Sequence, residues 1–277
     1  EQFWRANHWY DRAPSQEGEP QPVTPVLFST LESVLADLMD YYPEATLLGE
    51  EPGDDRAADR LTKLIRYVLK RRKYRAVYRT KARAALGIPP DAFVVGYIGR
   101  LHTMGMPKGL DTLVDAIARA SERGGPVDLL LVGGPDDGVR ALSDQWSARG
   151  LPDERLLAAG QVPPAQIPRY LAALDAGALP LPWTEHFAYY ASAIKLFEYL
   201  AVGCAVIASD LPSTAEVVRD GETALLAPPG DVQAWADALI RLRDDPALRR
   251  RLQDAACALS THYTWEARAS RIRAFVE

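Results

Sequence analysis

YASAIKLFEYLAVGCAVIASD, residues 190–210, joins an amphipathic helix to a short apolar strand in one continuous run. The apolar side chains recur at helical spacing, and we expect Ser192 to cap the start of the helix. Gly203 should end it, because the apolar run at residues 205–208 is typical of a buried strand. The run therefore predicts a helix from Ser192 to Gly203 that leads directly into the core of a sheet.

Two charged residues near the start of this helix indicate a ligand site. Lys195 and Glu198 lie three residues apart, so they share one face of the helix. Free backbone amides and the positive end of the helix dipole favour a phosphate at the first turn, and Glu198 can accept hydroxyl protons from a sugar. These features predict a nucleotide-sugar site. The alternative interpretation is an ordinary amphipathic helix whose Lys195 and Glu198 are solvated.

Helices and strands alternate on either side of this run. Apolar strands are expected at 94–99, 127–132, 156–159, 176–181 and 205–208, with helices at 110–120, 139–147, 167–174 and 214–218 between or after them. Three more helices, near 232–243, 246–259 and 265–276, should pack on the outside. Continuously apolar strands that alternate with helices predict an α/β fold with a doubly wound, Rossmann-like parallel sheet. Ligands of such sheets bind beyond the carboxyl ends of the strands.

Two cations fall at that edge of the predicted sheet. Gly99 and Arg100 follow the first strand, and Lys108 precedes the next helix. Arg100 can contact phosphate oxygens in a bidentate manner, and Lys108 adds a point charge, so together they can stabilise a departing nucleoside diphosphate. Solvated loop cations are the alternative. The segment Gly160-Gln161-Val162 follows the third strand and either presents backbone groups to a nucleobase or forms a plain turn.

The first 84 residues have a different character. Residues 60–83 are rich in Lys and Arg threaded by apolar residues, which indicates a basic amphipathic helix. Such a helix can lie on an anionic membrane surface or bind an acidic partner, and it can also simply hold a connecting helix in water. We expect residues 1–84 to form a short, incomplete N-terminal region with a basic linker helix, and residues 85–277 to form the ligand-binding domain.

Composition excludes several classes of protein. The chain has 277 residues, 48% of them hydrophobic, and a net charge of −5, which argues against a nucleic-acid-binding protein. Its two cysteines, Cys204 and Cys257, lack the spacing of a metal or redox site, so we expect buried thiols in the cytoplasm. No run is long and apolar enough to span a membrane, and no metal-ligand constellation is present.

The ordered set of motifs resembles the C-terminal domain of family 4 (group 1) glycosyltransferases of the GT-B fold. The matching segments include Gly99-Arg100, Lys108-Gly109, Gly160-Gln161-Val162-Pro163 and Ser192–Tyr199. The resemblance implies a domain that binds a nucleoside-diphosphate sugar, UDP- or GDP-linked, and that needs neither metal nor another cofactor. It implies that the catalytic cations Arg100 and Lys108 hold the diphosphate, that Glu198 binds the ribose, and that the donor also contacts Gly99, Val162, Ser192, Lys195 and Leu196. Retention of anomeric configuration is a further expectation.

The sequence also departs from this family. Many members carry two glutamates, and the first would fall at Tyr190, which is not acidic. Only about 85 residues precede the donor domain, so most of the acceptor domain of a GT-B enzyme is expected to be missing. The chain is therefore either a glycosyltransferase acting on a hydroxyl acceptor, such as a glycan, a lipid-linked sugar or a small molecule, or a non-catalytic nucleotide-sugar-binding subunit. An isomerase is disfavoured because no acid/base cluster is evident.

Overall fold

The computed structural model describes residues 72–276, and all of them belong to one compact unit. The expected acceptor-domain remnant falls largely within residues 1–71, outside the described residues, as does the first half of the basic segment 60–83. The boundary at residue 84 stays a prediction.

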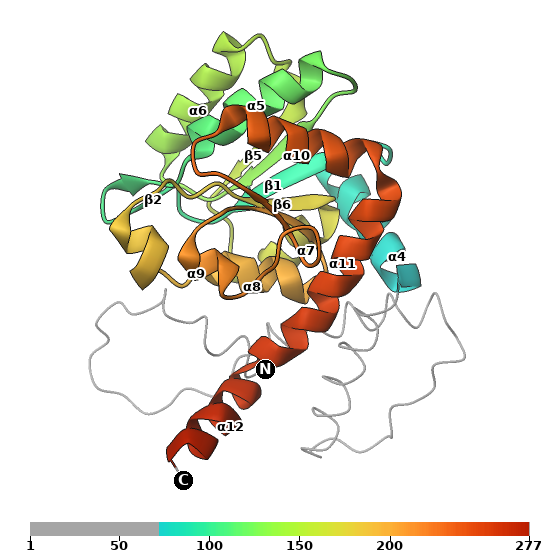
Figure 1. Ribbon diagram of the computed structural model, residues 1–277. Coiled ribbons are helices and arrows are strands. Elements are labelled where there is room, and N and C mark those ends of the chain that lie inside the picture. The colour runs from blue at the N-terminus through green and yellow to red at the C-terminus, as the bar shows by residue number, and fades with distance from the viewer. Residues whose placement is uncertain (1–71, 277) are drawn as a thin grey trace, which may run out of the picture. The chain divides into compact units, whose positions relative to one another are not determined.

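A parallel sheet forms the centre of the described unit, as the sequence predicts (Figure 1). Its six strands lie in the order β5-β4-β1-β6-β7-β8. The strands are β1 (Val94–Ile98), β4 (Asp128–Val132), β5 (Leu156–Gly160), β6 (Ala176–Leu179), β7 (Ala205–Ser209) and β8 (Leu225–Ala227). Sequence reasoning missed β8, because a three-residue strand is too short to show a period.

Helices cover both faces of the sheet (Figure 1). One face carries α5 (Leu110–Glu122), α6 (Asp136–Ala148) and α10 (Val232–Asp244). The other carries α4 (Arg72–Leu86), α7 (Ile167–Ala173) and α8 (Ile194–Ala201). The remaining helices are α9 (Pro212–Ala215), α11 (Pro246–Ser260) and α12 (Trp265–Val276), with short helical turns at 153–155, 164–166, 186–190 and 261–263.

Successive side chains of each strand point to opposite faces of the sheet and pack into two hydrophobic cores. In β1, Val95 and Tyr97 point into the core under α5, while Val94 and Ile98 point into the core under α8. All four are at most 3% exposed. Burying an aliphatic side chain of this size contributes about 1.5–3 kcal/mol, so strands covered on both faces are strongly stabilised.

The start of α8 corrects one expectation. The helix begins at Ile194, the preceding residue is Ala193, and no side chain caps its first turn. Ser192 stands one residue too early, because a capping oxygen must come from the residue that directly precedes the helix. The predicted Ser192 cap is therefore wrong. Helix α9 likewise begins at Pro212, two residues before its predicted start.

Helix α4 is tied to the amino end of the sheet by a buried ion pair. Arg83 Nη2 lies 2.6 Å from Asp175 Oδ2, and both side chains are 3% exposed. Arg79 Nη1 lies 2.9 Å from the other carboxylate oxygen. The Arg83 guanidinium also donates hydrogen bonds of 2.8–3.0 Å to the carbonyl oxygens of Ala173, Pro90 and Ala92. Arg83 thus binds the end of the basic segment to the protein interior, whereas Lys81 on the same helix is exposed.

Candidate functional site

Three glycine turns build the carboxyl edge of the sheet. Gly99 and Gly133 follow β1 and β4, Gly160 is the last residue of β5, and each of the three has a positive φ. The Gly99 N–H donates to the Val132 carbonyl at 2.6 Å, and the Gly133 N–H donates to the Gly160 carbonyl at 2.7 Å. A Cβ on Gly133 would lie 2.0 Å from the Gly99 oxygen, so only glycine permits this approach. The edge is therefore a continuous, closely packed backbone surface.

The three predicted cations meet at this edge. A Cβ on Gly99 would lie 1.6 Å from Lys195 Cε and 2.1 Å from Lys195 Nζ, so the lysine side chain occupies the space that glycine leaves open. Burial, together with the neighbouring charges of Lys195 and Arg100, lowers the pKa of Lys108 to about 8. This mutual repulsion shows that the three cations share one site, which a bound anion would relieve.

Glu198 completes the charged cluster. Burial raises the pKa of its carboxyl group, while the charge of Lys195 opposes that rise. Burial lowers the pKa of Lys195, an effect that Glu198 opposes and Arg100 reinforces. The Lys195–Glu198 pair on α8 is thus partly desolvated. When a ligand binds, each side chain can form contacts with it in place of part of the attraction between the two charges.

An unpredicted hairpin brings Lys108 back to Arg100. Strands β2 (His102–Thr103) and β3 (Met106–Pro107) pair antiparallel, and the turn between them uses the positive φ of Met104 and Gly105. The Lys108 N–H donates to the Leu101 carbonyl at 3.1 Å and closes the loop. In the sequence, Met104-Gly105 was the only indication of a turn here. The two flanking strands have two residues each, which is too short to show the alternation of a strand.

Tyr199 fixes α8 against β1. Its hydroxyl accepts a hydrogen bond of 3.1 Å from the Ile98 N–H and lies 3.3 Å from the Gly96 carbonyl. A Cβ on Gly177 would lie 2.6 Å from the ring, so the small residue in β6 makes room for it. Tyr199 is fully buried, and this burial raises its pKa well above the usual value. Tyr199 therefore helps to fix the positions of Lys195 and Glu198 on the same helix. Sequence reasoning assigned no role to it.

The other predicted donor contacts lie around this cluster. Leu196 is 2% exposed and belongs to the core, and its N–H is bonded to the Ala193 carbonyl at 2.9 Å. Ser192 is exposed just before α8. Val162 follows β5, two strands away from β1, and packs against the core in a partly buried position. Donor binding by these three residues stays a prediction.

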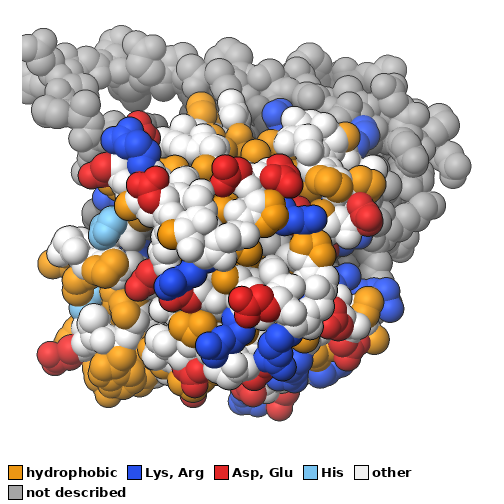
Figure 2. Space-filling model, turned by 90° about the horizontal axis from the view of Figure 1, so that it is seen from above, with side chains coloured by type: hydrophobic (Ala, Val, Ile, Leu, Met, Phe, Trp, Pro, Cys, Tyr) orange, Lys and Arg blue, Asp and Glu red, His pale blue; other side chains and the backbone are white. Residues whose placement is uncertain are grey.

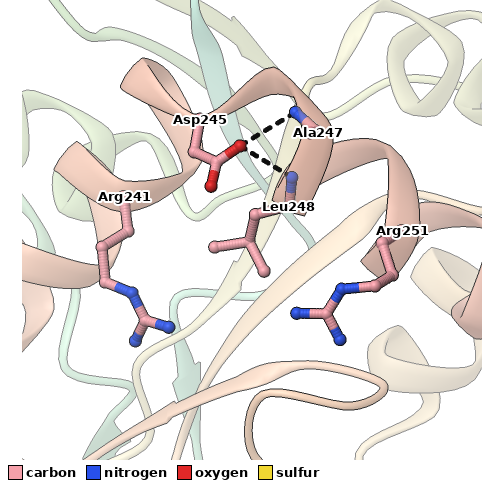
Figure 3. Close-up of a pocket in the computed structure, with 5 residues that line it drawn as sticks. All are labelled: Arg241, Asp245, Ala247, Leu248 and Arg251. Carbon is pink, nitrogen blue, oxygen red and sulfur yellow. Dashed lines mark hydrogen bonds between the residues drawn. The ribbon is translucent and has the colours of Figure 1, made fainter.

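Other hollows in the described surface differ from this edge. One of about 490 Å³ is lined by Arg241, Asp245, Ala247, Leu248 and Arg251 (Figure 3). There Asp245 accepts hydrogen bonds from two amides at the start of α11, so a carboxylate already occupies that helix end. Another of about 630 Å³ surrounds the Arg83–Asp175 pair. In both hollows a carboxylate already neutralises positive charge, which is unfavourable for a phosphate.

Two kinds of feature are absent from the described residues. No group of three or more His, Cys, Asp or Glu side chains there is arranged to hold a metal ion. Within the same range, no helix has the length and apolarity to cross a membrane.

Comparisons with known proteins find relatives among the glycosyltransferases. A D-inositol 3-phosphate glycosyltransferase from Corynebacterium efficiens is 28% identical over 263 residues, which cover 89% of this chain and 55% of the relative. A phosphatidyl-myo-inositol mannosyltransferase from Mycobacterium leprae is 35% identical over 187 residues, covering 67% and 46%. The chain thus spans about half the length of the curated relatives it matches.

A solved structure gives the same picture. Alr3699/HepE of Anabaena, crystallised in complex with UDP and glucose, superimposes with a TM-score of 0.61 at 25% identity, covering 72% of this chain and 52% of that one. The family model described as glycosyl transferases group 1 matches residues 92–245, more than half of the 277-residue chain. The protein therefore belongs to the group 1 glycosyl transferases, the family that its sequence motifs resemble.

Proposed function

We propose that the described domain binds a nucleoside-diphosphate sugar and that the protein transfers this sugar to a hydroxyl acceptor. The observation that carries the proposal is the meeting of Arg100, Lys108 and Lys195 at one edge of the sheet, where burial and then their mutual repulsion lower the pKa of Lys108. The likeness to Alr3699/HepE, a structure that contains UDP and glucose, supports this assignment. An anionic diphosphate is the ligand chemistry that such a cluster favours.

Each group at the edge takes a distinct part in the proposed reaction. Arg100 and Lys108 stabilise the negative charge that grows on the diphosphate as the bond to the sugar breaks. The amides of Ile194 and Lys195 in the first turn of α8, together with the Lys195 side chain, hold the phosphates in place. Glu198 accepts hydrogen bonds from the ribose hydroxyls, and the segment Gly160–Val162 contacts the base. We infer retention of anomeric configuration, with no metal and no cofactor besides the donor.

Release of nucleotide tests the transferase proposal. Purified protein is incubated with UDP-glucose or GDP-mannose in EDTA, with and without a mixture of sugar and polyol acceptors, and nucleoside diphosphate is measured by chromatography. Acceptor-dependent release that is lost in Arg100→Ala supports transfer, and the anomeric NMR signal of the product reports its configuration. Release that requires a divalent cation would contradict the metal-free part of the proposal.

A second candidate is a nucleotide-sugar-binding subunit without catalysis of its own. The observation that favours it is that the chain spans about half the length of the curated relatives. This candidate predicts that the chain alone binds UDP or GDP but releases no product, and that product is released only when an acceptor domain is added. An independent enzyme would release product without that domain.

The location of the protein is also a proposal. Cys204, which is buried, and Cys257, which is partly buried, form no disulfide with each other; this supports a reducing compartment, and we place the protein in the cytoplasm. Contact with an anionic membrane would rest on the basic segment 60–83, whose first half lies outside the described residues. Vesicle co-sedimentation that falls with added salt and with neutralisation of Arg71, Arg72 and Lys73 supports it; sedimentation that responds to neither contradicts it.

A further inference from the structure

The segment between β6 and α8 presents three aromatic side chains to solvent. Trp183, Tyr189 and Tyr190 are 57%, 61% and 72% exposed. The rings of Trp183 and Tyr189 meet edge to face, with centroids 6.3 Å apart. Figure 2 shows hydrophobic side chains gathered at the lower left of the visible face. Large aromatic side chains exposed next to one another mark a binding surface more often than isolated ones do.

The backbone beneath these rings is held firmly. Phe187 is 2% exposed and Ala188 is fully buried, so the inner side of the turn is part of the core. The Phe187 N–H donates to the Thr184 hydroxyl at 3.1 Å, and the Ser213 hydroxyl donates to the Phe187 carbonyl at 2.7 Å. A surface whose backbone is already ordered loses less entropy when a ligand binds than one that must first be ordered.

The aromatic segment continues from the candidate donor site. A Cβ on Gly109 would lie 1.9 Å from the Pro180 oxygen and 3.6 Å from Pro182 Cδ, so the loop that carries Lys108 touches the start of the segment. In the sheet, β5 and β1 lie on one side of β6, from which the aromatic segment extends. A donor whose base lies beyond β5 and whose phosphates lie beyond β1 therefore points its sugar toward Trp183.

The chemistry of the surface favours a ring-shaped polar ligand. Among the described residues, neither the Trp183 indole N–H nor the hydroxyl of Tyr189 has a hydrogen-bond partner, so both remain available at the edges of flat apolar rings. A sugar or cyclitol ring is complementary to this surface, because it has an apolar C–H face that can stack on an aromatic ring and hydroxyl groups around its edge that can form hydrogen bonds. Exposed Glu185 in the same segment opposes binding to an anionic membrane surface.

We propose that Trp183 and Tyr189 form a platform on which the acceptor stacks, and that the acceptor is a pyranoside or a cyclitol. This inference rests on the proposed function, because it places the acceptor beside the donor sugar. The pair positions the acceptor ring and takes no part in bond breaking. Substitution is expected to weaken acceptor binding about two- to tenfold and to leave nucleotide binding unchanged.

Fluorine NMR on the whole chain tests this platform. The six tryptophans are labelled with 5-fluorotryptophan, the Trp183 signal is assigned with Trp183→Phe, and UDP or GDP binding is measured on the same sample by calorimetry. Methyl α-mannoside, methyl α-glucoside and myo-inositol are then titrated into the nucleotide-saturated protein. We expect a saturable shift of the Trp183 signal with at least one ring, while fully buried Trp146 and Trp235 do not respond.

Matched controls make the outcomes decisive. Tyr189→Ala should weaken the response, whereas Phe275→Ala, which removes a 92% exposed ring on α12, should not. Sorbitol, which has hydroxyl groups but no ring face, should give no shift. Nucleotide binding with a silent Trp183, or a Trp183 that responds only to phospholipid vesicles, would overturn the platform and leave the donor site intact. A sugar-dependent shift without any nucleotide binding would instead overturn the donor site.

Discussion

At the scale of single residues, Gly99 decides whether the cations can assemble. Its φ of +142° is rare for residues with a side chain, and the space of its absent Cβ is filled by Lys195. Gly99→Ala should therefore displace the lysine and weaken nucleotide binding at least tenfold in calorimetry. Gly150→Ala is the matched control, since Gly150 also has a positive φ but has no atom near its Cβ position. Equal nucleotide affinity in the two variants would contradict this account.

Lys108 predicts how binding depends on pH. Its pKa of about 8 in the unliganded protein means that the ammonium loses its charge as the pH rises from 7 to 9.5. A bound diphosphate raises this pKa again, so binding takes up a proton, and affinity falls as the pH rises through 8. We expect UDP affinity to fall severalfold across this range.

Two variants test that this pH dependence belongs to Lys108. Lys108→Gln should bind more weakly at pH 7 and show a flatter profile, because the titrating group is gone. Arg140→Gln, which removes an exposed cation of α6, should retain the profile of the unsubstituted protein. A profile that stays unchanged in Lys108→Gln would assign the pH dependence to another group.

At the scale of elements, the sequence predicted where charges gather but not how they are held. Because the carboxyl ends of parallel strands share one edge, Arg100, Lys108 and Lys195 were predicted together from three separate segments. The Ser192 cap was wrong because a shift of one residue depends on backbone angles that the pattern does not contain. The β2–β3 hairpin and the Tyr199 hydroxyl were missed because they depend on contacts between distant segments.

The hydroxyl of Tyr199 carries a prediction for the docking of α8. Tyr199→Phe keeps the ring but leaves the buried Ile98 N–H without its partner, which costs about 1–3 kcal/mol. We expect the free energy of unfolding in urea to fall by that amount. Tyr189→Phe, at an exposed ring, should change it by less than about 0.5 kcal/mol. Equal stability of the two variants would mean that the hydrogen bond to β1 does not fix the helix.

At the scale of the whole molecule, the described unit has opposite chemistry at the two edges of its sheet. The carboxyl edge gathers cations that repel one another, while the amino edge pairs Arg83 with Asp175 in the interior. The sequence predicted the fold class because its strands are apolar throughout. It did not predict the buried pair, since Arg83 lies in a basic segment whose pattern is equally typical of a solvated surface.

The buried pair should dominate the stability of the amino edge. Arg83→Met leaves Asp175 buried with fewer partners, and we expect it to lower the free energy of unfolding by about 3–5 kcal/mol. Arg123→Met breaks an ion pair whose side chains are 50% and 48% exposed, and should cost less than about 1 kcal/mol. A similar fall in the free energy of unfolding in both variants would show that burial does not determine how much each ion pair contributes to stability.

Calorimetric titration with UDP and with GDP tests the central claim, that the carboxyl edge is a nucleoside-diphosphate site. The account predicts binding of at least one nucleotide with micromolar to millimolar affinity, weakened at least tenfold by Arg100→Ala and by Glu198→Ala. Arg241→Ala, in the hollow at the start of α11, should leave the affinity unchanged. Binding that survives the first two substitutions, or no binding of either nucleotide, would contradict it.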